Sequence, residues 1–168
     1  MLKRFYPSEY VNSSYVINYE ELYQAGYRGI LFDIDNTLVS HGAKADDKAI
    51  ELITCLKNIG FRVCLISNNK EERVRTFNDE VHVKYIYNAH KPSRSGYHKA
   101  MDTIGTNKDN TIFIGDQIFT DVFGANRAGL KTILVKPIHP KEEIQIVLKR
   151  YLEKIVLFFY MKGQKKKP

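Results

Sequence analysis

The stretch that decides the fold reads Gly29-Ile30-Leu31-Phe32-Asp33-Ile34-Asp35-Asn36-Thr37. Its first four residues form a short apolar run, which is typical of a strand buried on both faces of a parallel sheet. Two carboxylates follow the run directly, two positions apart. Buried carboxylates cost free energy unless a cation compensates them. The segment therefore predicts a buried strand whose carboxyl end carries chemistry.

Short apolar runs and amphipathic stretches alternate from this segment to the end of the chain. The alternation predicts an α/β domain, a Rossmann-like three-layer sandwich around a central, mostly parallel five-stranded sheet. In such sheets the carboxyl ends of the strands lie at one edge, where ligands bind. The strands are expected at 29–32, 61–66, 83–87, 111–114 and 130–135, and the helices at 46–60, 70–78, 93–104, 121–128 and from about Lys141 onward.

Polar side chains follow four successive strand ends, beginning with the Asp33 segment. Ser67-Asn68-Asn69 comes after the second strand and His90-Lys91-Pro92 after the third. Gly115-Asp116 ends the fourth, and Asp121 follows shortly afterwards. An isolated Asp-x-Asp pair would more often be a helix cap beside a solvent-facing acid. Here an acid pair, a hydroxyl, a cation and a second acid pair converge at one edge, which predicts a phosphate site with Mg²⁺ on carboxylate oxygens.

These four segments resemble the four motifs of the haloacid-dehalogenase-like (HAD) phosphatases. The resemblance extends from residue 29 to about residue 136, in order, spacing and strand context. Neighbouring features resemble one subgroup, the YqeG-type branch of the capless class (subfamily IIIA). They are the segments Pro7–Val11, Asp35–Val39, Ser67–Asn69 and Gly124–Gly129.

The resemblance implies a role for each catalytic candidate. Asp33 would attack phosphorus and form an aspartyl-phosphate. Asp35 would protonate the leaving oxygen and then deprotonate a water molecule. Thr37 would shape the loop that aims the two acids, Ser67 would donate a hydrogen bond to the phosphoryl group, and Lys91 would neutralise its charge.

The resemblance also implies a Mg²⁺ site. Asp116 would bind the ion together with Asp33 and the main-chain carbonyl of Asp35, and Asp121 would orient a ligand or water on the metal. Plainer interpretations remain open for several candidates. Thr37 and Ser67 could be ordinary turn residues, Lys91 could be a surface lysine, and Asp121 could cap the helix that follows it.

The spacing of the motifs leaves no room for a large cap domain. Residues 37–61 hold one loop and one helix, and residues 69–91 hold one helix and one strand. We expect an N-terminal extension over 1–28 that packs on the core, a catalytic core over 29–140, and a C-terminal amphipathic helix with a basic tail over 141–168. A capless site admits large substrates or phosphates displayed on a surface.

Composition and charge further narrow the class of protein and its expected partners. The 168 residues carry a formal net charge of +7, which favours anionic partners. Only two cysteines occur, Cys55 and Cys64, each in an apolar run, so we expect core residues rather than disulfides or a zinc site. Neither a secretory signal nor an apolar stretch of membrane-spanning length is evident. We therefore expect a cytoplasmic protein.

The C-terminal segment leaves several partners open. Its apolar residues fall on one helical stripe, and a lysine-rich tail follows. The stripe could pack on the sheet or on a second subunit, contact an anionic membrane at its inner face, or contact nucleic acid, which we favour least. The chain carries no P-loop and no G-x-G-x-x-G. The residues of the stripe are Ile144, Val147, Leu148, Tyr151, Leu152, Ile155 and Phe159.

Three functions are consistent with these features, and none of them specifies the oligomeric state. YqeG-type proteins are similar to the mitochondrial and plastid phosphatases of phosphatidylglycerophosphate, so this lipid phosphate is the leading candidate substrate. A soluble metabolite, a nucleic-acid end or a phosphoprotein would suit the same motifs. A non-enzymatic domain that binds RNA or the ribosome is the third alternative. Against it, a site that has lost its catalytic activity has no reason to keep costly clustered charges.

Overall fold

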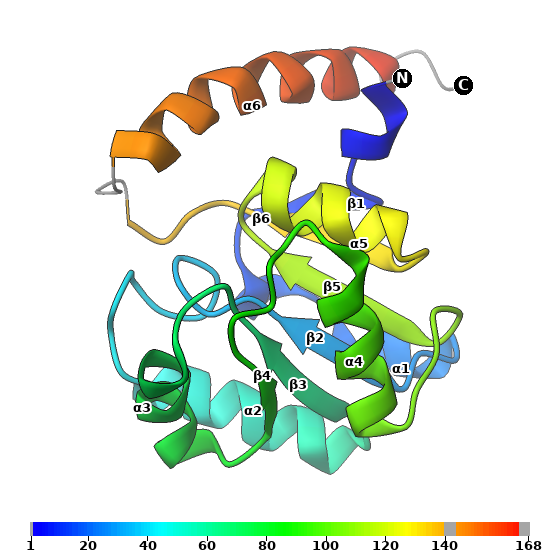
Figure 1. Ribbon diagram of the computed structural model, residues 1–168. Helices are drawn as coiled ribbons and strands as arrows, with labels where there is room; N and C mark the ends of the chain where they lie inside the picture. The colour runs from blue at the N-terminus through cyan, green and yellow to red at the C-terminus, as the bar shows by residue number, and fades with distance from the viewer. Residues whose placement is uncertain (1, 140–143, 165–168) are drawn as a thin grey trace.

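The computed structural model describes residues 2–139 and 144–164. Their strands form a single parallel sheet in the order β1-β6-β5-β2-β3-β4 (Figure 1). This confirms the predicted α/β architecture. The strands are β1 (Glu9–Val11), β2 (Gly29–Phe32), β3 (Arg62–Ile66), β4 (Lys84–Ile86), β5 (Thr111–Gly115) and β6 (Lys131–Val135).

The sheet has six strands, whereas the sequence predicts five. The additional strand, β1, comes from the N-terminal segment and pairs with β6 at the edge of the sheet, with Glu9 opposite Ile133. Ser8 and Thr132 exchange further hydrogen bonds beside it. Three residues are too few to show a hydrophobic period, and tertiary pairing therefore decides this strand.

Helices cover both faces of the sheet, as expected for a three-layer sandwich (Figure 1). Ile30 and Phe32 of β2 belong to the apolar core beneath α2 and α3, whereas Leu31 belongs to the core beneath α4 and α5. Residue Phe32 is the last of β2, so Asp33 lies where the strand leaves the core. The helices are α1 (Tyr19–Gln24), α2 (Asp47–Ile59), α3 (Glu71–Val81), α4 (Arg94–Ile104), α5 (Phe123–Arg127) and α6 (Ile144–Gln164), with single turns at Leu2–Phe5, Ser14–Val16 and Ile118–Val122.

Helix α2 begins and ends at the residues that the sequence indicates. The Asp46 carboxylate accepts a hydrogen bond from the Ala49 amide at 2.9 Å, and Gly60 ends the helix in the left-handed region. The expectation that both cysteines are buried is wrong for Cys55, which is exposed, whereas Cys64 is buried in β3. Cys55 lies two residues after the buried Ile53, about 200° around the helix, and therefore faces solvent.

No cap domain is present among the described residues. One extended loop with a short bridge between Asp35 and Val39 connects β2 to α2, and α3 alone separates β3 from β4. The carboxyl edge of the sheet is therefore not enclosed by an inserted domain.

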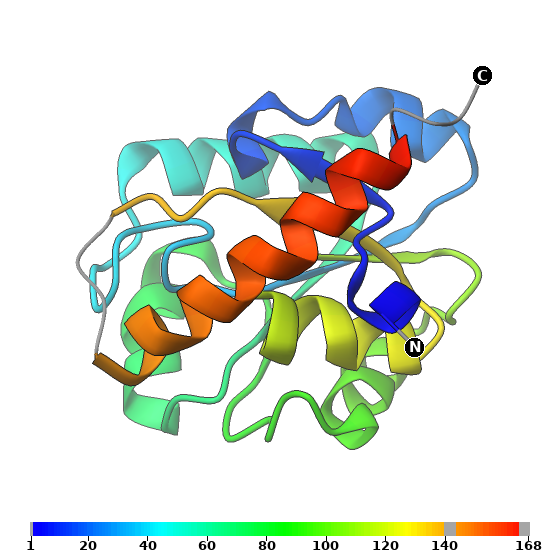
Figure 2. The same cartoon turned by 90° about the horizontal axis from the view of Figure 1, so that it is seen from above.

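Helix α6 crosses over the sheet (Figure 2). Five residues of its predicted apolar stripe are exposed to solvent. The helix packs through Val156, which joins Ile118 and Leu134 in a small apolar cluster. Within the described chain, no helix is both long and apolar enough to cross a bilayer. The predicted helix start near Lys141 and the tail lysines at 165–167 lie outside the described residues, whereas Lys162 belongs to α6. The exposed members of the stripe are Leu148, Tyr151, Leu152, Ile155 and Phe159.

Candidate active site

The first candidate, Asp33, follows the last residue of β2. Its amide extends the sheet by donating to the Ile114 carbonyl of β5 at 3.0 Å, so the backbone at Asp33 is held by the neighbouring strand. The side chain is buried. Burial raises the pKa of Asp33 to about 6, with the charges of Asp121 and Asp35 adding to the rise while Lys91 opposes it. A carboxylate in this position requires a positive neighbour.

Lys91 supplies that positive charge. Its Nζ lies 2.7 Å from Asp33 Oδ1 and 2.7 Å from Asp121 Oδ1. Burial alone would lower the pKa of Lys91, but the two carboxylates outweigh it and raise the pKa above its usual value. Asn68 fixes the backbone of Lys91, accepting from its amide at 2.6 Å and donating to its carbonyl at 3.0 Å. Lys91 therefore lies buried between two acids as a rigidly placed cation.

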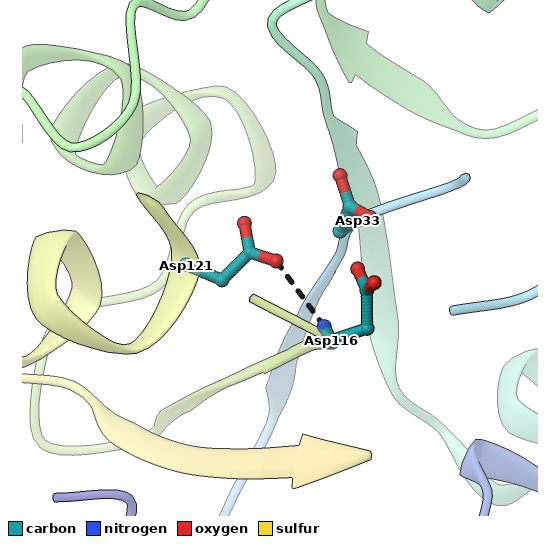
Figure 3. A group of neighbouring side chains, drawn as sticks. All are labelled: Asp33, Asp116 and Asp121. Carbon is teal, nitrogen blue, oxygen red and sulfur yellow. Dashed lines mark hydrogen bonds between the residues drawn. The ribbon is translucent and has the colours of Figure 1, made fainter. Parts of the chain in front are cut away.

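Three buried acids meet at this edge of the sheet (Figure 3). One carboxylate oxygen from each of Asp33, Asp116 and Asp121 lies within 4.8 Å of the others. The Thr37 hydroxyl lies between two of them, 3.1 Å from Asp33 Oδ2 and 3.2 Å from Asp116 Oδ1. Burial, followed by the charges of Asp33 and Asp121, raises the pKa of Asp116 well above its usual value. The three acids are therefore placed together against electrostatic repulsion.

Asp121 is oriented by the backbone at the end of β5. Its Oδ2 accepts from the amides of Asp116 at 3.2 Å and Gln117 at 3.1 Å. Gly115 makes this possible, because a Cβ at that position would lie 2.5 Å from Asp121 Oδ2. The backbone amides thus fix Oδ2 of Asp121, while its other oxygen, Oδ1, accepts from Lys91.

The structure brings Asp35 and Ser67 to the same pocket but not to the acidic cluster. Asp35 points toward α3, where it accepts from Arg73 Nη2 at 2.8 Å and from Asn69 Nδ2 at 2.7 Å. The Ser67 hydroxyl accepts from the Asn69 amide at 3.0 Å. Asp33, Asp35, Ser67 and Lys91 all line one pocket of about 210 Å³. The carboxylate of Asp35 therefore lies in the pocket that Asp33 lines, but it is bound by Arg73 and Asn69 and not by Lys91.

Two residues of α6 that were not predicted from the sequence also contact the site. Arg150 forms an ion pair with Asp116 and donates to its carbonyl at 2.6 Å. Glu153 accepts from the Ile118 amide at 2.8 Å and from Arg150 at 2.9 Å. Both residues sit within a charged stretch of helix, where no signal in one sequence separates them from solvent-facing neighbours.

The donor set of the cluster fits a hard divalent cation. Three carboxylates are contacted by two cations, Lys91 and Arg150, so negative charge remains in excess. Carboxylate oxygens are the ligands that Mg²⁺ prefers. A divalent ion would offset the excess negative charge, which adds to burial in raising the pKa of Asp33 and Asp116.

Comparison with known proteins agrees with this geometry. Residues 30–91 match the family described as haloacid dehalogenase-like hydrolase, and residues 88–143 match a second HAD-hydrolase-like family. The chain is 36% identical to "Probable phosphatase YqeG" of Bacillus subtilis (strain 168), over 94% of this chain and 92% of the relative. A crystal structure of a HAD-superfamily hydrolase from Ehrlichia chaffeensis superposes with a TM-score of 0.55 at 17% identity, covering 76% of this chain and 97% of that one.

More distant relatives carry a substrate in their names. "Phosphatidylglycerophosphate phosphatase 1, chloroplastic/mitochondrial" of Arabidopsis thaliana is 25% identical over 82% of this chain. "Phosphatidylglycerophosphate phosphatase 1, chloroplastic" of Chlamydomonas reinhardtii is 26% identical over 82% of this chain. The chain spans 45% and 55% of the length of these two relatives.

A parallel α/β sheet with clustered acids and a lysine at its carboxyl edge is the arrangement expected of a HAD-type hydrolase, and the family matches agree with it. The chain belongs to the haloacid-dehalogenase-like phosphatases, within the branch of the B. subtilis YqeG protein.

Proposed function

We propose that the protein is a Mg²⁺-dependent phosphomonoesterase that acts through an aspartyl-phosphate on Asp33. The observation that carries this proposal is the placement of Asp33, with its carboxylate 2.7 Å from Lys91 and within 4.8 Å of two further acids. A nucleophilic carboxylate must approach an anionic phosphate, and positive charge at its side reduces the repulsion between them.

The reaction divides into two displacements. In the first, an oxygen of Asp33 forms a bond to phosphorus, the bond from phosphorus to the ester oxygen breaks, and Asp35 gives that oxygen a proton. In the second, Asp35 takes a proton from a water molecule whose oxygen attacks phosphorus, which releases inorganic phosphate and restores Asp33. The contacts of Asp35 with Asn69 and Arg73 would hold its carboxylate in the pocket that Asp33 also lines.

Other residues bind and orient the phosphoryl group. Lys91 would donate to a phosphoryl oxygen as well as to Asp33, and the Ser67 hydroxyl would donate a further hydrogen bond. Thr37 bridges Asp33 and Asp116 and so keeps the nucleophile aligned. Ser14 supports this loop from the N-terminal segment by donating to the Thr37 carbonyl at 2.8 Å.

Mg²⁺ would be held by Asp33, Asp116 and the main-chain carbonyl of Asp35, with Asp121 orienting a ligand of the ion. When bound, the ion supplies positive charge that stabilises the negative charge of the transition state. Arg150 already neutralises one oxygen of Asp116, so this arginine and the ion would share that carboxylate.

The relatives and the absence of a cap among the described residues support a proposal for the substrate class. Two relatives are named as phosphatidylglycerophosphate phosphatases, and the site carries no cap domain in the described residues. We propose that this protein hydrolyses the same lipid phosphate as a cytoplasmic enzyme peripheral to the inner face of the membrane. Phosphates of soluble metabolites, nucleic-acid ends or phosphoproteins are the alternatives that the assay must separate.

Phosphate release with Mg²⁺ across a substrate panel tests the proposal. The panel holds phosphatidylglycerophosphate in anionic vesicles, sugar phosphates, nucleotides and a phosphopeptide. Asp33→Asn keeps the size of the side chain but removes the nucleophile, so we expect turnover to fall at least about 10³-fold while the fold is retained. Asp109→Asn, at a surface acid, is the matched control. Normal turnover in Asp33→Asn would refute the nucleophile, and a silent panel would favour a binding domain.

A further inference from the structure

Helix α6 exposes a continuous apolar surface. Six side chains of the helix, each between 45% and 65% exposed, repeat at helical spacing along one side, which we call the outer face of α6. Figure 2 shows that no described segment lies over this helix. An exposed apolar patch of this kind marks an interaction surface. The outer face consists of Leu148, Tyr151, Leu152, Ile155, Phe158 and Phe159.

The opposite side of the helix fixes this orientation. Glu153 and Val156 are buried, and Glu153 accepts from the Ile118 amide at 2.8 Å. Arg150 forms an ion pair with Asp116, and Tyr160 packs edge-on against Tyr6. Rotating the helix to bury its apolar side would therefore break buried polar contacts. The outer face points to solvent because the opposite side of α6 attaches to the core, through polar contacts of Arg150 and Glu153 and through the apolar side chain of Val156.

The charge around the outer face selects the kind of partner. Lys154 and Lys162 are exposed on or beside this face, and Lys154 Nζ lies 5.0 Å from the centre of the Tyr151 ring. Within 144–164 the sequence has a single acid, Glu153, which is buried against Arg150. An apolar face bordered by lysines, with aromatic side chains among its aliphatic ones, is the composition of helices that lie in the interface of an anionic bilayer.

A second copy of the chain fits this surface less well. A two-fold contact would place the same patch on both sides of the interface. The lysines that border the patch would then face lysines, with no exposed acid on the described helix to pair with them. An anionic lipid surface pairs with the lysines and buries the apolar side chains at once.

The start of α6 also borders the candidate active site. Ile146 and Lys149 line the same pocket as Asp33 and Lys91. We propose that the outer face of α6 docks on an anionic lipid bilayer and thereby brings this pocket to phosphate groups displayed on that surface. The inference rests on the proposed function only for the chemistry that follows docking, because the binding itself needs no turnover.

Co-sedimentation with vesicles tests the docking surface. The full chain carrying Asp33→Asn is mixed with vesicles of equimolar phosphatidylglycerol and phosphatidylcholine, or of phosphatidylcholine alone, at low and high salt. We expect binding to the anionic vesicles that weakens with salt. The double variant Leu152→Gln/Ile155→Gln keeps helix-forming residues but removes two apolar contacts, so we expect affinity to fall at least about tenfold. Val16→Gln, at an apolar residue outside α6 that is somewhat more exposed, should bind unchanged.

Several results would overturn the inference. These are failure of the chain to bind anionic vesicles, equal binding by the double variant, or a dimer in sedimentation velocity that the double variant dissociates. Turnover of p-nitrophenyl phosphate, measured with Asp33 intact, separates the two proposals. If the chain turns over p-nitrophenyl phosphate with or without the double substitution, and both forms bind vesicles equally, the docking surface alone is rejected. Vesicle binding that the double variant loses, without any phosphatase activity, would reject the proposed function alone.

Discussion

The acidic cluster and the outer face of α6 reverse the usual rule of burial in opposite ways. At the cluster, Asp33, Asp116 and Asp121 are buried, although ionised carboxylates are most stable in water. On α6, side chains such as Leu152 and Phe158 are exposed, although burial would stabilise them. Both arrangements cost free energy in the isolated chain.

The difference lies in where each region finds its compensation. The cluster is compensated partly from within, because Lys91 and Arg150 contact its carboxylates, and the remaining negative charge calls for a small cation. The outer face of α6 has no compensation among the described residues and calls for a large apolar partner. One region therefore indicates an ion and a phosphate, and the other indicates a surface.

Removing the internal cation should give the largest effect. Lys91→Met keeps the length of the side chain but leaves Asp33 and Asp121 without their shared partner. We expect the free energy of unfolding of the metal-free protein to fall by about 3–5 kcal/mol, as when one member of a buried ion pair is lost. Chemical denaturation measures this loss, and Lys84→Met, at an exposed lysine, should change little. Unchanged stability in Lys91→Met would contradict a buried ion pair at this site.

Adding a divalent cation should give an effect of intermediate size. Mg²⁺ at about 100 times its dissociation constant should stabilise the protein by about 2.7 kcal/mol, and so raise Tm by roughly 5–10 °C for a domain of this size. The gain should be absent in Asp116→Asn, which removes a ligand, and present in Asp109→Asn, an exposed acid. Scanning calorimetry with and without Mg²⁺ provides the measurement. An equal gain in Asp116→Asn would place the ion elsewhere.

Shortening apolar residues on the two sides of α6 should give the smallest effect and the most direct contrast. Val156→Ala removes buried atoms and should cost about 1–2 kcal/mol of stability. Leu152→Ala removes more atoms, but from an exposed side chain, and should stay within about 0.5 kcal/mol. Both are read from denaturation in the absence of lipid. If Leu152→Ala cost more than Val156→Ala, the outer face of α6 would be buried in the free protein.

Local signals account for most of the fold over the core. The apolar runs predict β2 to β6 to within a residue or two. The reason is clearest for β2 and β5, whose residues are all buried and therefore almost all apolar. Asp46 and Gly60 mark the limits of α2 by capping chemistry that acts within a few residues. The same reasoning fails for β1, a three-residue edge strand, and for Cys55, whose side of the helix depends on the phase set by packing.

Sequence alone determined the α/β class, the missing cap and the four strand ends that carry Asp33, Ser67, Lys91 and Asp116, since parallel topology brings all such ends to one edge. Only the tertiary structure decided how the side chains divide between partners: Asp33 to Lys91, and Asp35 to Arg73. It also decided that α6 faces inward with Arg150 and Glu153 and outward with its apolar stripe. The physical reason is that hydrophobic periodicity identifies the apolar side of a helix, whereas contacts distant in sequence determine which side meets the core.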